Sequence, residues 1–232
     1  MDHKRRAVAY WLIAGVVMIV IEFIMGGVTR LTGSGLSITE WKPIMGALPP
    51  MGDDDWNKAF DSYKQIAQYK YVNSHFELPD FKFIFYWEWA HRLWARMLGV
   101  VFAIGFVYFF VRKYFDKQMV QPFIILFILG GLQGFVGWKM VESGLNDTEL
   151  YVKHTWLATH FLSALTLMGY TLWFALALLV PEERRTNAPA TFKQVVGIIV
   201  LTYVQLAWGA FMAGMHASKS APTWPTINGD II

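Results

Sequence analysis

The chain has 232 residues, of which 55% are hydrophobic, 17% aromatic and 16% charged. Because a soluble domain usually carries about a quarter charged residues, this composition excludes an ordinary water-soluble fold and indicates a membrane protein. The formal net charge of +3 is too small to indicate nucleic-acid binding, and a sequence without cysteine cannot form disulfides, thiolate metal sites or thiol nucleophiles.

Five apolar stretches are long enough to cross a bilayer as helices, which requires roughly 20 residues each. Most run without the period-two alternation of barrel strands. The first stretch follows a short basic N-terminus but is too long for a signal peptide and contains no small-residue cleavage site, so we interpret it as a retained span. The predicted spans are Val8 to Val28, Phe83 to Val111, Met119 to Val141, Val152 to Val180 and Phe192 to Met215.

The distribution of lysine and arginine predicts the orientation of these spans. Basic residues precede the first span and lie between the second and third and between the fourth and fifth, whereas the loop 142–149 contains neither lysine nor arginine. By the positive-inside rule the N-terminus is expected inside and the C-terminus outside.

The long segment 30–82 is then an outer loop. It begins with a stretch rich in Gly, Ser and Thr, which favours tight turns, and continues with Trp41-Lys42-Pro43. Three aspartates open a predicted short helix that carries Trp56, Phe60 and Tyr63 on one face. An ordinary external loop and a lid over a site are both open interpretations.

The ends of the first and fifth spans resemble each other, which predicts an internal repeat. Met25-Gly26-Gly27 followed by Trp41-Lys42-Pro43-Ile44-Met45-Gly46 is loosely repeated as Met212-Ala213-Gly214 followed by Trp224-Pro225-Thr226-Ile227-Asn228-Gly229. Membrane proteins are often built from such repeats. We therefore expect an all-α, polytopic transmembrane bundle. Residues 1–180 would form a first four-helix half with the outer loop 30–82, and residues 192–232 the first helix and loop of a second, incomplete half, as in a truncated sequence.

Two histidines within the spans are candidate haem ligands. His91 in the second span and His160 in the fourth each lie about 12 Å from the outer end of their span, at 1.5 Å per residue. Two imidazoles at one depth on facing helices can form the axial pair of a haem iron. A histidine that only bridges two helices is the alternative. The remaining histidines are expected to be interfacial or solvated: His3, His75, His154 and His216.

Charged side chains accompany the first histidine. Glu88 lies three residues before His91 on the same helix face, and three roles are open for it: orienting His91, transferring protons at the haem edge, or pairing with Arg92. Arg92 and Arg96 are placed to bind haem propionates near the outer interface, because guanidinium suits carboxylate. Glu22, expected near the inner-middle part of the first span, is left without a role.

Several of these motifs resemble the haem A synthase family. The first-loop segment Gly26 to Ser37 with Trp41-Lys42-Pro43 matches that family's first outer loop, and Glu88-Trp89-Ala90-His91-Arg92 is similar to its Glu-x-x-His-Arg element. The Gln133-Gly134-x-x-Gly137-Trp138 stretch and the helix of His160 also match. The likeness runs from about residue 9 to the end and looks closest to the cysteine-free branch of proteobacteria and mitochondria.

The resemblance implies an eight-span protein of a bacterial inner (cell) membrane, made of two similar four-helix halves. It implies an oxidoreductase that converts the C8 methyl group of haem O to a formyl group, giving haem A for terminal oxidases. Carried over, Glu88 is the catalytic glutamate, His91 and His160 are ligands of the haem iron, and Arg92 and Arg96 bind the haem. The family's haem b is held by histidines of later spans, which lie beyond the end of this sequence.

Two other functional classes stay open. A b-type electron-transfer cytochrome would keep both histidines as permanent ligands and would not need Glu88, whereas a haem-free assembly or scaffold protein would use them only to bridge helices. The expected partners are haem O, haem O synthase, membrane lipid and an electron acceptor that the residues do not identify. A homo-oligomer is possible, and no nucleic acid is expected.

Overall fold

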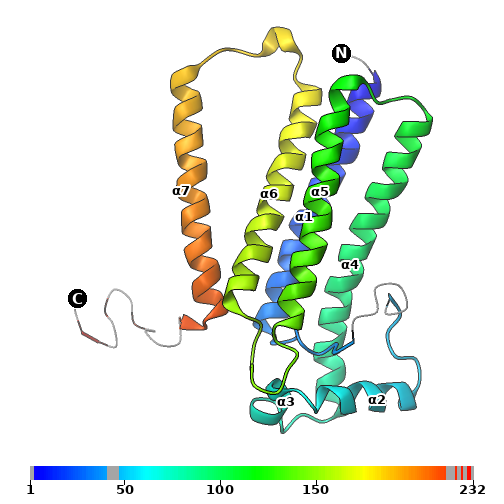
Figure 1. Ribbon diagram of the computed structural model, residues 1–232, viewed down its shortest axis with the longest axis vertical. Coiled ribbons are helices and arrows are strands. Elements are labelled where there is room, and N and C mark those ends of the chain that lie inside the picture. The colour runs from blue at the N-terminus through cyan, green and yellow to red at the C-terminus, as the bar shows by residue number, and fades with distance from the viewer. Residues whose placement is uncertain (1–2, 41–46, 218–222, 224–225, 227–228, 231–232) are drawn as a thin grey trace.

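The computed structural model describes residues 3–40, 47–217, 223, 226, 229 and 230, and the protein is an all-α bundle (Figure 1). Five helices are long and apolar enough to cross a membrane, which makes the chain a multi-pass membrane protein and confirms the five predicted spans. The segments Trp41 to Gly46 and Trp224-Pro225 of the predicted repeat lie outside the described residues. The membrane helices are α1 (His3–Leu31), α4 (Leu78–Val111), α5 (Lys117–Glu142), α6 (His154–Leu179) and α7 (Pro189–Gly214).

The helix α4 begins five residues before the predicted span because local hydrogen bonds start it there. The Glu77 side chain and Asp80 form a capping box, in which the Glu77 backbone N–H donates to Asp80 Oδ2 at 3.0 Å, and a proline stands in the first turn. At the start of α5, Asp116 Oδ1 accepts from the backbone N–H of Gln118 at 2.9 Å. Arg5 Nη2 binds the same aspartate at 2.7 Å and so ties α1 to this turn.

The helices α1, α4, α5 and α6 form a four-helix bundle, and α7 packs on the outer side of α6 (Figure 1). The helix α1 contacts both α4 and α6, and α5 contacts α6. Aromatic rings link α4 to α5, for example Phe106 and Phe127 edge to face at 4.9 Å. The grouping of residues 192–232 into a second repeat stays a prediction.

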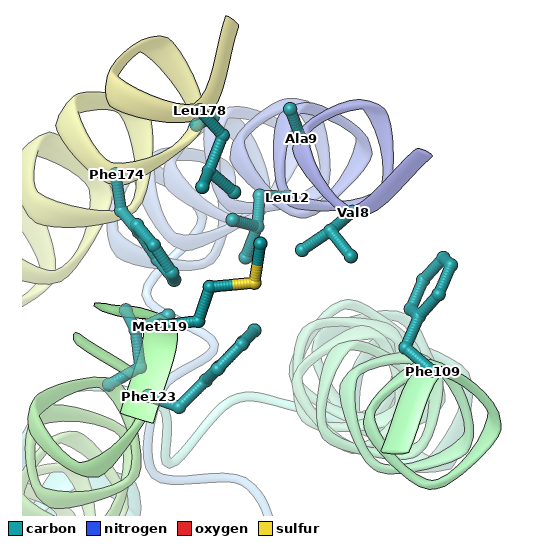
Figure 2. Packing of buried hydrophobic residues seen from close by; sticks show 10 residues of the cluster. Val8, Ala9, Leu12, Phe109, Met119, Phe123, Phe174 and Leu178 are labelled. Carbon is teal, nitrogen blue, oxygen red and sulfur yellow. The ribbon is translucent and has the colours of Figure 1, made fainter. Parts of the chain in front are cut away.

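One cluster of buried side chains holds the bundle together at the end where the N-terminus lies, which we call the N-terminal end. Figure 2 shows Leu12 of α1, Met119 and Phe123 of α5 and Phe174 of α6 converging there. Inside a bilayer, lipid is as apolar as these side chains, so the helices associate through close packing rather than through the hydrophobic effect. Each atom pair contributes only about 0.1–0.2 kcal/mol, and a cluster of many large side chains is therefore needed.

The opposite end of the bundle, the loop end, is covered by α2 (Asp53–Tyr63) and α3 (Ala67–Tyr71), which we call the cap (Figure 1). The predicted face of Trp56, Phe60 and Tyr63 is confirmed, and it packs against the first turns of α4 at Phe81 and Phe85. The segment is thus a packed layer over the bundle rather than an extended loop.

The cap is also bonded internally and to the loop between α5 and α6. The fully buried Tyr63 hydroxyl donates to Gln68 Oε1 at 3.1 Å and accepts from Asn73 Nδ2 at 2.8 Å. Burial raises the pKa of Tyr63 from its usual value of 10.0 to about 12. The backbone N–H of Ala67 donates to Asn146 O at 3.1 Å, so the two loops at this end are bonded to each other.

Candidate functional site

The ring of His91 points from α4 toward α1. Its Nε2 lies 3.0 Å from Oε1 of Glu22, and both side chains are 22% exposed. Gly26, one helical turn after Glu22, leaves the space that the ring tip occupies, because a Cβ there would lie 3.3 Å from His91 Nε2. Glu22 and Gly26 therefore form a recess on α1 that receives the imidazole.

The position of Glu22 corrects the sequence prediction. Glu22 was expected near the inner-middle part of its span, but it lies in the last third of α1, at the level of His91 and toward the loop end. The predicted span itself supports this position, because residue 22 lies 14 residues after Val8 and only 6 before Val28. Its second oxygen, Oε2, is buried and has no hydrogen-bond partner among the described residues.

His160 is held on the other side of the bundle by α5. Its Nδ1 lies 3.1 Å from Gln133 Nε2, and the same amide nitrogen donates to His160 O at 3.2 Å. Ser163 Oγ donates to Gln133 Oε1 at 2.5 Å, which fixes the amide. A Cβ on Gly137 would lie 2.7 Å from His160 Cε1, so this glycine is required for the close approach of the ring to α5.

The two histidines lie on two helices of the same bundle, and their equal depth stays a prediction. The helix α1 packs against the helices of both residues. Imidazole nitrogen is a strong ligand of haem iron, so this pair fits a haem by its donor chemistry.

Glu88 is buried, at 2% exposed, and both of its carboxylate oxygens are bonded. Oε2 accepts from Ser37 Oγ at 2.6 Å and from the backbone N–H of Ile38 at 2.9 Å. Oε1 accepts from Arg92 Nη2 at 2.5 Å, and the same nitrogen donates to Ile38 O at 3.1 Å. We call these four residues the Glu88–Arg92 clamp. Of the three roles left open for Glu88, its pairing with Arg92 is the one the structure displays, and the carboxylate bonded to His91 is Glu22.

A cavity of about 170 Å³ lies beside the clamp at the loop end. Ligand pockets usually measure roughly 300–1,000 Å³, so this one has room for a carboxylate group but not for a porphyrin. Arg92 lines it together with the acidic Glu40 and Glu142 and the ring of Trp138. Arg96 lies one turn further along α4, half-buried, with its Nη1 shielded from solvent.

The other histidines divide into two groups. His3 and His75 are exposed, as expected. His216 differs from the expectation, because its Nε2 lies 2.8 Å from Arg30 Nη2 and its ring centroid lies 4.0 Å from that of Tyr151. The exposed His154 packs against Gly214. A Cβ added to Gly214 would lie 2.7 Å from the Cβ of His154. His154 and His216 thus join α6 and α1 to the end of α7.

Comparisons with known proteins cover nearly the whole chain. The model of the COX15-CtaA family, described as cytochrome oxidase assembly protein, matches residues 9–232. A protein of Parvibaculum lavamentivorans named heme A synthase is 44% identical over 100% of this chain and 67% of its own length. Proteins of the same name from Maricaulis maris and Paracoccus denitrificans are each 42% identical over 99% of this chain, which corresponds to 67% and 62% of their lengths. No solved structure matches.

Proposed function

Because the chain belongs to the cytochrome oxidase assembly family, we propose that it acts in haem A biosynthesis as a haem A synthase, which oxidises the C8 methyl group of haem O to a formyl group. Relatives of that name align with nearly all of its residues, and the chain spans about two thirds of their length. The observation in the structure that carries the proposal is the pair His91 and His160, each in contact with a polar side chain of a neighbouring helix of the four-helix bundle.

The proposed reaction sets what the protein has to provide. Conversion of the methyl group to a formyl group takes one oxygen from water and releases four protons and four electrons, so an electron acceptor outside the described residues is required. Haem O supplies the methyl carbon and the iron when it is bound. The residues of this chain then have to bind the iron, orient the macrocycle and keep the site separate from bulk water.

His91 and His160 are proposed as the iron ligands. Hydrogen bonds to the second ring nitrogen orient a ligating histidine and fix its tautomer. Gln133 Nε2 donates to Nδ1 of His160, which leaves Nε2 as the nitrogen for iron once it has lost its proton. Gly137 keeps the ring against α5, so the direction of the ligand is set by helix packing.

Arg92 and Arg96 are proposed to bind the propionates. Arg92 borders the cavity at the loop end, and the geometry of a guanidinium suits a carboxylate. Glu88 is proposed to serve the reaction by holding Ser37 and Ile38 against α4, because both of its oxygens are already bonded there. The cap above them shields this end of the site from water.

We further propose that the N-terminal end of the bundle faces the cytoplasm of a bacterial inner membrane. The basic side chains of the segments 4–6 and 112–117 lie at this end. There Arg5 binds Asp116, and Lys4 Nζ donates to Lys113 O at 3.2 Å. By the positive-inside rule this end stays inside, so the cap and the cavity beside Arg92 face the outer side of the membrane.

Pigment analysis after expression with a source of haem O tests the function. Haem A from the wild type, with haem O or a hydroxylated intermediate accumulating in Glu88→Gln, supports the synthase and a role for Glu88 in it. Haem B alone in both, without conversion, would instead indicate a b-type electron-transfer cytochrome. A purified protein that binds no haem at all would indicate a scaffold. Asp61→Asn, on the exposed side of the cap, serves as the control and should convert haem O like the wild type.

A further inference from the structure

We propose that Glu22 competes with haem iron for His91, so that iron binds this histidine only after the Glu22–His91 contact opens. The inference rests on the proposed assignment of His91 as an iron ligand. It gives Glu22, a carboxylate in the last third of a membrane helix, a function that the synthase chemistry itself does not supply. A charged side chain at this depth is costly and is retained for a reason.

The atom that Glu22 binds carries the argument. The contact of 3.0 Å is made by Nε2, the ring nitrogen furthest from the backbone. A carboxylate that orients a ligating histidine normally binds the nitrogen opposite to the metal. Here the carboxylate sits on the nitrogen that reaches furthest into the bundle. One nitrogen cannot donate its hydrogen to Glu22 and give its lone pair to iron, so the two partners exclude each other.

The recess on α1 makes the contact specific. Gly26 removes the side chain that would otherwise fill the space next to Nε2, and Glu22 stands one turn before it on the same helix face. The recess therefore holds the ring on the side of α1, and the imidazole has to leave it to reach iron elsewhere in the bundle.

The contacts of the Glu22 and Glu88 carboxylates show which of the two can release its partner more easily. Glu88 has both oxygens bonded, to two groups of the first loop and to Arg92. Glu22 holds His91 through Oε1 alone, and its buried Oε2 has no hydrogen-bond partner among the described residues. Releasing Glu22 from His91 breaks one contact, whereas releasing Glu88 breaks all the hydrogen bonds of the Glu88–Arg92 clamp that its carboxylate accepts. Glu22 is thus the exchangeable carboxylate and Glu88 the fixed one.

The competition lowers the apparent affinity for haem. Affinity falls by the fraction of protein in which His91 is released. Nε2 of His91 and Oε1 of Glu22 lie 3.0 Å apart, and a charge-assisted contact of this length keeps that fraction at about one tenth or below. Removing the carboxylate should therefore strengthen haem binding through His91 by about tenfold, which is the opposite of what the loss of an orienting residue would do.

Haem titration of the full chain in detergent micelles tests this, with haem B as the probe and the Soret band as the readout. We expect Glu22→Ala to bind haem about tenfold more tightly and faster than the wild type, Glu22→Gln to fall between them, and all three to share one spectrum at saturation. Asp61→Asn, whose partner is Lys64 on the exposed side of the cap, is the matched carboxylate control and should bind like the wild type.

Two results would overturn the proposal: unchanged binding in Glu22→Ala, or weaker binding with an altered spectrum at saturation, which would make Glu22 an orienting residue. Gly26→Ala provides a second variant that keeps the carboxylate: its methyl group would lie 3.3 Å from His91 Nε2, push the ring tip by a few tenths of an ångström and so weaken the contact with Glu22, which should also strengthen binding. If Glu22→Ala does not fold, haem binding by Gly26→Ala that is no tighter than that of the wild type equally rejects the competition. His91→Ala separates the two proposals: haem binding identical to the wild type in that variant rejects the ligand assignment itself.

Discussion

The Glu88–Arg92 clamp should stabilise the loop end of the bundle by an amount that a double-mutant cycle can measure. The Glu88 side chain is 2% exposed and that of Arg92 12%, so water replaces few of the bonds that a substitution removes. Breaking a buried pair by removing one partner costs about 3–5 kcal/mol, because the other charge stays buried without it. We expect Glu88→Leu to lower the free energy of unfolding by about that much.

The double variant distinguishes a coupled pair from two separate contributions. Glu88→Leu with Arg92→Leu leaves no buried charge behind, so it should cost less than the sum of the two single variants by about 1 kcal/mol or more. Denaturant unfolding in micelles, followed by the fluorescence of the 11 tryptophans, gives the four free energies. Additive losses would refute the clamp as a coupled unit.

The chain offers an independent test because it contains no cysteine. A Thr39→Cys reporter, placed directly after the clamped residues Ser37 and Ile38, can be labelled with a thiol reagent without background. Loss of the Glu88 carboxylate should release the segment from α4 and speed the labelling in Glu88→Leu. Labelling at the wild-type rate would show that other contacts hold the loop.

Three further outcomes are expected. Gly137→Ala places a Cβ 2.7 Å from His160 Cε1, so the ring has to shift, and we expect a loss of about 1–3 kcal/mol in unfolding experiments together with a changed haem spectrum. The pKa of Tyr63 is raised to about 12, so the stabilisation of the fold by its neutral hydroxyl is complete below pH 10 and is lost as the pH rises toward 12. The Tyr63→Phe variant should therefore show a shallower decline of the free energy of unfolding between pH 10 and 12. Arg5→Gln removes a contact to Asp116 between side chains that are 32% and 38% exposed, and should cost no more than about 1 kcal/mol, decreasing further at high salt.

The membrane helices were predictable from sequence because a bilayer demands one simple property, a long apolar run. The start of α4 was not, because Leu78 to Lys82 is amphipathic and the capping box of Glu77 and Asp80 determines the first turn. The apolar face of α2 was visible from the spacing of Trp56, Phe60 and Tyr63. Its position over the bundle depends on contacts with α4 that no local pattern encodes.

The residues of the candidate site were likewise only partly predictable from the sequence. Counting residues from the span ends predicted His91 and His160 at one level, whereas Glu22 was assigned to the inner-middle part of its span although it lies only six residues before the outer end, Val28. No contact with His160 was predicted for Gln133 and Gly137, although their spacing of four residues puts them on one face of α5.

The bonds between Ser37 and Glu88 were beyond sequence reasoning. They join residues separated by 51 positions, and only the folded loop brings them together.

The conversion of haem O by the protein in membranes of the expressing cells, which supply an electron acceptor, tests the central claim most directly. The reaction should be followed by extracting the pigments and separating haem O, its hydroxylated form and haem A, with the wild type beside His91→Ala and His160→Ala. The account predicts haem A from the wild type and no haem A from either histidine variant. Haem A formation at the wild-type rate in both variants would contradict the placement of the substrate haem, and no conversion by the wild type would contradict the proposed function.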